Sequence, residues 1–232
     1  MQIKVGTNLL DKPEVITVEQ FQNLILFNFE DSRWDAQICA YLLNTKPNAF
    51  TNVNPIDLLQ LKAYLLEPLE RLDSAQLKNY IEGRRLIDLN KMTFGTFVDL
   101  DVLTVEGLEN TLSQLIAMLY NTDPEEVAQW PIESVWPALR AWQTNRANIY
   151  KRYEYLFATD SQTGDANEGN RVSIKESWYK LIIALSSEEF LNIHQVVERP
   201  LIEALNFLDW LKAKREQEAR EMRRKLNKLK MK

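Results

Sequence analysis

The sequence has few of the residues on which metalloproteins, disulfide-rich proteins and many enzymes depend. It contains one cysteine, Cys39, and one histidine, His194, in 232 residues. A single cysteine excludes an intrachain disulfide and a cysteine-based zinc site. No apolar run approaches the length of about 20 residues that a membrane helix needs, and the first residues do not match a signal peptide. We therefore expect a protein of a reducing compartment that binds no cofactor.

Glycine is scarce as well, with six residues in the whole chain. Loop-rich β folds need more turn residues than this, whereas the abundant Leu, Glu, Gln, Lys and Ala favour helices. The one exception is the segment 79–89, where two short extended pieces flank Glu82-Gly83 and predict a β-hairpin. The sequence therefore predicts a mainly α fold, or α+β with this minor hairpin near 79–89.

Helix-start signals recur along the first two thirds of the chain. Thr17 and Gln20 form a capping box, and Asn54-Pro55 combines a strong N-cap with a proline in the first turn. The helix that follows Asn54 has an apolar face made of Ile56, Leu59, Ala63 and Leu66. Thr104 is expected to cap a later helix.

The segment 158–171 separates these helices from the rest, because it is rich in turn formers and has no apolar periodicity. We predict a helical domain over 1–157, a linker over 158–171 and a small helical module over 172–211. A basic helical tail over 212–232 completes the chain and is expected to protrude.

The net charge of −5 conceals an asymmetry. The tail, from Lys212 onward, carries ten Lys or Arg and three acids, whereas the remaining chain carries 18 basic and 30 acidic residues, a net charge of −12. An acidic body with a basic tail is suited to self-association or to holding a charged partner.

Few residues suggest chemistry. Asp99 and Asp101 have the spacing of two cation ligands, but no further oxygen ligands and no calcium-loop glycine follow. Gly95 belongs to no phosphate-loop pattern and is expected to allow close backbone approach. We expect both aspartates to face water, Phe94 and Phe97 to be buried, Cys39 to be a buried thiol and His194 to lie at the surface or in packing. No catalytic residue and no metal site are predicted.

The six tryptophans mostly fall on predicted apolar helix faces. Trp130-Pro131 and Trp136-Pro137 lie at helix joints, where an exposed ring can anchor a partner. In the tail, Met222, Leu226 and Leu229 form a thin apolar stripe beside Arg223 and Arg224. These seven residues are the predicted partner-binding set: Trp130, Trp136, Met222, Arg223, Arg224, Leu226 and Leu229.

Several segments resemble small helical proteins of tailed bacteriophages of Bacteroidetes-type hosts, namely tail assembly chaperones and related virion-morphogenesis factors. The resemblance covers about Ile16 to Lys214 and leaves out the basic tail. It is carried by a TVEQFQNL-like helix start and a hairpin, followed by IDLNKMTFGTFVDLD, LIAMLY, IYKRYEYLF, WYKLIIALSSEEF and PLIEALNFLDWLKAK. It implies a protein without catalytic activity that binds an unfolded or extended tape-measure protein.

Three functions from different classes follow from these observations. The first is a non-enzymatic tail assembly chaperone, located in the host cytoplasm, whose partner is a tape-measure or other tail protein. The second is a structural virion component, such as a head–tail connector or ring subunit, in which copies of the chain associate. The third is nucleic-acid binding through the basic tail, which the acidic body and the interleaved glutamates of the tail disfavour.

Overall fold

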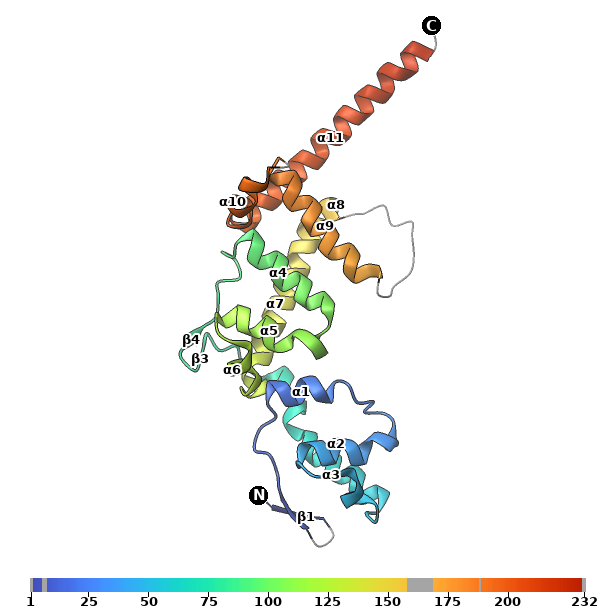
Figure 1. Ribbon diagram of the computed structural model, residues 1–232, viewed down its shortest axis with the longest axis vertical. Helices are drawn as coiled ribbons and strands as arrows, with labels where there is room; N and C mark the ends of the chain where they lie inside the picture. Colours follow the sequence, from blue (N-terminus) through green and yellow to red (C-terminus); the bar gives the residue numbers. More distant parts are fainter. Residues whose placement is uncertain (1, 6–7, 158–168, 188, 231–232) are drawn as a thin grey trace. The chain divides into compact units, whose positions relative to one another are not determined.

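The computed structural model describes residues 2–5, 8–157, 169–187 and 189–230 (Figure 1). Its α-helices are α1 (Val18–Leu24), α2 (Asp35–Leu42), α3 (Pro55–Glu70), α4 (Phe94–Glu106), α5 (Leu108–Tyr120), α6 (Pro124–Ala128), α7 (Ile132–Arg152), α8 (Glu154–Phe157), α9 (Gly169–Leu185), α10 (Ile193–Val197) and α11 (Leu201–Lys230). Four short 3-10 helices are η1 (Ser32–Trp34), η2 (Pro47–Phe50), η3 (Leu72–Ser74) and η4 (Phe190–Asn192). The strands form two antiparallel pairs, β1 (Gln2–Val5) with β2 (Asn8–Asp11) and β3 (Tyr80–Ile81) with β4 (Arg84–Arg85). The predicted mainly α fold is confirmed.

The chain forms two compact units whose boundaries differ from the predicted domains. Unit 1 contains Met1–Ile87 and Glu106–Trp142, and unit 2 contains Asp88–Val105 and Gln143–Lys232. Of the predicted linker, residues 158–168 lie outside the described residues and 169–171 begin α9. The sequence order does not reveal this division, because α4 packs against the ring of Trp178, which lies far away along the chain.

The β3–β4 hairpin forms as predicted in the segment 79–89. Tyr80 pairs with Arg85 and Ile81 with Arg84. Glu82 and Gly83 between them have φ angles of 46° and 76°, as a two-residue type I′ turn requires. The hairpin is anchored in unit 1 by Ile81, which is buried.

In unit 1, the start of α1 is joined to the start of α7. Thr17 and Gln20 form the predicted capping box. The residues on either side of Thr17 also exchange backbone hydrogen bonds with the segment around Pro131: the Val18 amide donates to the Trp130 carbonyl, and the Ile132 amide donates to the Ile16 carbonyl, each at 2.9 Å. Two helices therefore begin at one short antiparallel bridge.

The same arrangement occurs in unit 2, where α4 and α11 begin together at a bridge between Thr93 and Pro200. The Phe94 amide donates to the Arg199 carbonyl at 2.8 Å, and the Leu201 amide donates to the Met92 carbonyl at 3.1 Å. The stretch Thr93–Thr96, whose turn residues raised the question of a phosphate site, therefore serves to dock one helix start on another.

Thr104 does not cap a helix, contrary to the prediction. It lies in the last turn of α4, where its hydroxyl donates to the Leu100 carbonyl at 2.7 Å. The residue that precedes α5 is Gly107, with a φ of 97°. Apolar residues recur at helical spacing from Phe94 to Leu103. The helix α4 therefore continues through the segment where a new helix was predicted to begin.

Gly95 allows the close approach that its place in the sequence suggested. A Cβ atom at this position would lie 2.9 Å from the Cβ of Val197 and 3.1 Å from the Val197 carbonyl oxygen. Val197 ends α10, immediately before the segment that pairs with Thr93. The absence of a side chain at Gly95 therefore lets α4 start against the end of α10.

We predict that Gly95→Ala lowers the free energy of unfolding by about 1–3 kcal/mol, because the added methyl group must displace backbone atoms of a packed neighbour. Asp99→Ala is the control, since Asp99 is exposed on the same helix and exposed substitutions usually change stability little. Urea unfolding of both variants measures the difference. Equal stability of the two variants would show that the α4–α10 contact is loose.

Candidate functional site

The carboxylate of Asp101 is completely buried inside unit 2. Three side chains donate hydrogen bonds to it: Arg146 through Nε at 2.5 Å, Tyr150 through its hydroxyl at 2.8 Å, and Trp178 through Nε1 at 2.7 Å. Arg146 and Tyr150 are on α7, and Trp178 is on α9. Within unit 2, Asp101 therefore links α4 to α9 and to the part of α7 that follows Trp142.

Aromatic rings surround this buried carboxylate. Phe94 and Phe97, both completely buried as predicted, meet the Trp178 ring edge-on with centroids 5.8 Å away in each case. The Phe157 ring lies 4.4 Å from that of Tyr150 and 5.5 Å from that of Trp178. The cluster holds one negative charge, neutralised by Arg146, in otherwise apolar surroundings.

The chemistry of this cluster is that of a satisfied internal ion pair. Burial, followed by the charge of Asp101, raises the pKa of the Tyr150 hydroxyl, which therefore remains a protonated donor at neutral pH. Both carboxylate oxygens of Asp101 are already occupied by donors, which leaves little capacity for a cation. No group of three or more potential metal-ligating side chains occurs in the part of the chain that the structure describes.

The prediction that Asp101 faces water is wrong, whereas Asp99 is exposed as expected. Asp101 follows Phe94, Phe97 and Val98 at the spacing of one helix face, so its place on the buried side was present in the sequence. The signal was missed because the two aspartates were interpreted as a pair. Residues two apart on a helix do not share a face.

The other two candidates for chemistry also have structural roles. Cys39 is completely buried, and burial, with the nearby charge of Asp35, raises the pKa of its thiol to about 12. It is therefore a packing residue, as predicted. His194 is exposed, and its Nε2 lies 3.2 Å from a carboxylate oxygen of Glu198, one turn away on the same helix surface.

The strongest candidate for a binding surface is the outer face of α3, in unit 1. The side chains of Ile56 and Leu59 are 65% and 53% exposed, Ala63 is exposed and Leu66 is half-buried. Their spacing of three, four and three residues places them on one side of the helix. We call Ile56, Leu59, Ala63 and Leu66 the α3 stripe.

The opposite side of α3 is held inward by a buried ion pair. Lys62 and Leu65 are the buried residues of this helix. The Lys62 ammonium donates to Asp35 Oδ1 at 2.5 Å and to the Phe29 carbonyl at 3.1 Å. Because an unpaired charge is costly to bury, this contact fixes which side of α3 faces the interior. The apolar face found in the sequence is consequently the outer one.

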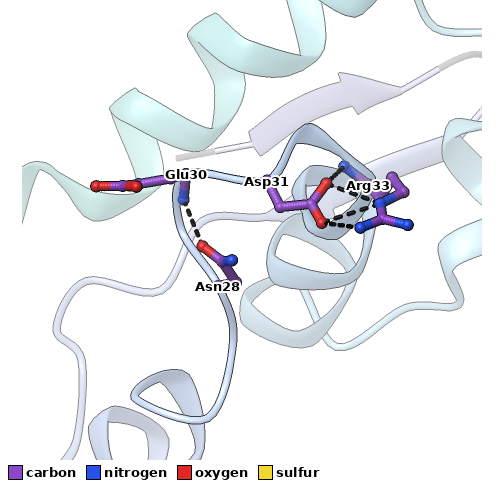
Figure 2. A network of polar contacts seen from close by, with 4 residues as sticks. All are labelled: Asn28, Glu30, Asp31 and Arg33. Atoms are coloured by element: carbon purple, nitrogen blue, oxygen red, sulfur yellow. Dashed lines mark hydrogen bonds and ion pairs between the residues drawn. The ribbon is translucent and has the colours of Figure 1, made fainter.

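Local hydrogen bonds shape the loop that supplies the Phe29 carbonyl to Lys62 (Figure 2). Asn28 Oδ1 accepts from the Glu30 amide at 3.0 Å, and Asp31 Oδ1 accepts from the Arg33 amide at 3.0 Å. The Arg33 guanidinium also donates to Asp31, which lowers the pKa of that carboxyl. The loop thereby presents the Phe29 carbonyl and leads directly into the helix that carries Asp35.

The predicted partner-binding set is only partly at the surface. Trp130 is 5% exposed and its ring meets that of Tyr120 at 5.7 Å, so its prediction as a surface anchor is wrong. The isolated bridge at Pro131 turns this ring into the core of unit 1. Trp136 is half-buried against Phe21, with centroids 5.6 Å apart, and its indole nitrogen has no hydrogen-bond partner among the described residues.

The α11 members of that set are exposed. Met222 and Leu226 are 60% and 50% exposed, and Arg223 and Arg224 beside them are exposed as well. The side chain of Leu229 lies outside the described residues. All side chains from Gln217 to Asn227 are exposed, so this part of α11 extends away from the other helices of unit 2 (Figure 1).

Sequence reasoning missed a groove near the start of α11. It has a volume of about 480 Å³ and is lined by the C-terminal end of α9, by α10 and by α11. Its lining residues combine apolar and polar side chains: Leu185, Asn192, Gln195, Val196, Arg199, Glu203, Ala204 and Phe207. Phe207 is 50% exposed, and its ring lies tilted against that of Trp210, which is 53% exposed, with centroids 5.5 Å apart. We call this the α10–α11 groove.

We predict that Asp101→Asn lowers the free energy of unfolding by about 2 kcal/mol or more, because the variant removes the charge and sets an amide N–H against the donors of one of the two oxygens. Asp99→Asn, two residues away on the exposed side, should change it by less than about 0.5 kcal/mol. Thermal or urea unfolding of the two variants gives the comparison. A loss no greater than the control would contradict the structural role of Asp101.

No helix among the described residues is long and apolar enough to cross a membrane. No protein-family model, curated protein or solved structure matches the chain.

Proposed function

We propose that the protein is a non-enzymatic helical adaptor that binds an extended segment of a tail protein, such as a tape-measure protein, during bacteriophage tail assembly. The observation that carries this proposal is the α3 stripe. Ile56 and Leu59 remain exposed on a helix whose other side is already packed. Contiguous exposed apolar residues of this kind are typical of protein interaction sites.

The geometry of the stripe suits a segment held along α3. Side chains at i, i+3, i+7 and i+10 form a continuous apolar line on a helix surface, and helix faces of this kind commonly bind apolar groups of another chain. Polar residues flank the line, including Asp57, Gln60 and Glu70, which are exposed. An apolar centre with a polar rim resembles the anatomy of transient protein interfaces. The phage resemblance supplies the proposed identity of the partner.

A direct test is co-expression with a tape-measure-like protein encoded beside this chain. The wild-type protein should keep that partner soluble, and Ile56→Asp/Leu59→Asp should lose this effect while retaining its melting temperature, because both side chains are exposed. Asn52→Asp/Gln60→Asp adds the same charge beside the stripe and should behave as the wild type. If the wild-type protein leaves the solubility of the partner unchanged, the proposal is wrong.

A structural virion component is the second candidate, and the exposed half of α11 favours it. A 30-residue helix whose last described side chains touch no other element is suited to contact a neighbouring subunit. Mass spectrometry of purified particles separates the two functions. A chaperone is expected to be absent from the finished virion, whereas a ring or connector subunit is present in stoichiometric amounts.

A further inference from the structure

The segment around the α10–α11 groove and the exposed end of α11 carry opposite net charges. The residues 189–211, which supply the groove lining except for Leu185, carry four acids and one arginine, a net charge of −3. The residues 220–230 carry six Lys or Arg and one glutamate, a net charge of +5. Two charged side chains line the groove itself, Glu203 and Arg199, and the other acids of this segment lie outside its lining. Among the described residues, no carboxylate pairs with Arg223, Arg224 or Lys225.

The two surfaces are also complementary in apolar character. Leu185, Val196, Ala204 and Phe207 line the groove, and the ring of Phe207 is half exposed. On the end of α11, Met222 and Leu226 are separated by one helical turn and are both at least half exposed. An amphipathic helix placed in an apolar groove is a recurring mode of recognition, and its anchors have this i, i+4 spacing.

The end of α11 cannot reach the groove of its own chain. One wall of the groove is the first part of α11 itself, and the helix is continuous from Leu201 to Lys230. Phe207 and Met222 are 15 residues apart, which corresponds to about 22 Å along an α-helix. A helix without a break cannot fold back over that distance, so any α11 end that fills the groove comes from another molecule.

We propose that the exposed end of α11, with Met222, Leu226 and the adjacent arginines, docks in the α10–α11 groove of a second copy of this chain. Such a contact is heterologous, since different surfaces of the two copies meet, and it repeats from copy to copy into a ring or an open filament. The alternative of two α11 ends pairing side by side brings two segments of charge +5 together, which is unfavourable at low salt. This inference does not depend on the α3 stripe.

The test uses two variants of the full chain that each retain one of the surfaces. Met222→Asp/Leu226→Asp removes the docking end, and Glu203→Lys/Phe207→Asp removes the groove. Both alter exposed side chains, and circular dichroism checks that both remain folded. Ala213→Asp/Asn227→Asp is the matched control, because it adds two acids to exposed positions of α11 outside the apolar stripe. Sedimentation velocity over a range of protein concentrations measures the assembly state.

The wild type and the control should form species larger than a dimer, which dissociate as salt is raised. Each variant alone should be monomeric. An equimolar mixture of the two variants should give a 1:1 dimer and nothing larger, since one intact end then meets one intact groove. A mixture that remains monomeric overturns the proposal, and so does a groove variant that still self-associates. A wild type that is monomeric but whose tail binds DNA at low salt also overturns it.

Discussion

The carboxylate of Asp101 is the contact on which unit 2 depends. A buried charge is tolerated only when it is paired and its hydrogen-bonding capacity is filled, and Arg146, Tyr150 and Trp178 fulfil both conditions. Because these donors come from two other helices, the requirement fixes the position of α4 relative to α7 and α9. The aromatic rings around the carboxylate then exclude water, which strengthens the ion pair.

A second buried ion pair has a comparable role in unit 1, and it has a consequence for function. Lys62, bonded to Asp35 and to the Phe29 carbonyl, determines which side of α3 is inside. The α3 stripe is thereby left at the surface, and none of the described elements covers Ile56 and Leu59. The two buried ion pairs are thus structural contacts, whereas the side chains of the α3 stripe are exposed.

Much of the fold follows from local sequence signals. The capping box at Thr17, the turn at Glu82-Gly83, the close approach at Gly95 and the burial of Phe94 and Phe97 are all confirmed, since each depends on chemistry within a few residues. The unit boundaries, the burial of Trp130 and the partners of Asp101 were missed, because they depend on contacts between segments distant in the chain. The α3 stripe was identified as an apolar face, but only the Lys62 contact shows that it faces outward.

A bridge that joins two helix starts occurs once in each unit. It could not be predicted from the sequence, because it also depends on contacts between segments that are distant in the chain. ITVEQFQNLI and LTVEGLENTL are the two stretches that look alike in sequence, but only the first begins a helix at its threonine. The structural counterpart of Thr17 is Thr93. The sequences around these two threonines share little beyond the capping residue itself. Each of the two helix starts pairs with a segment that is distant in the chain and centred on a proline, Pro131 for Thr17 and Pro200 for Thr93.

The role of Asp101 can be tested most directly by cutting the chain between its partners. A specific protease site placed within 158–168 allows the purified protein to be cleaved between α8 and α9 under native conditions. The account predicts that the two pieces remain together during gel filtration, because Trp178 and α9 are held by Asp101, Phe94 and Phe97. The same cut in Asp101→Asn should release the C-terminal piece at a lower urea concentration. Separation of the wild-type pieces in buffer alone would contradict the account.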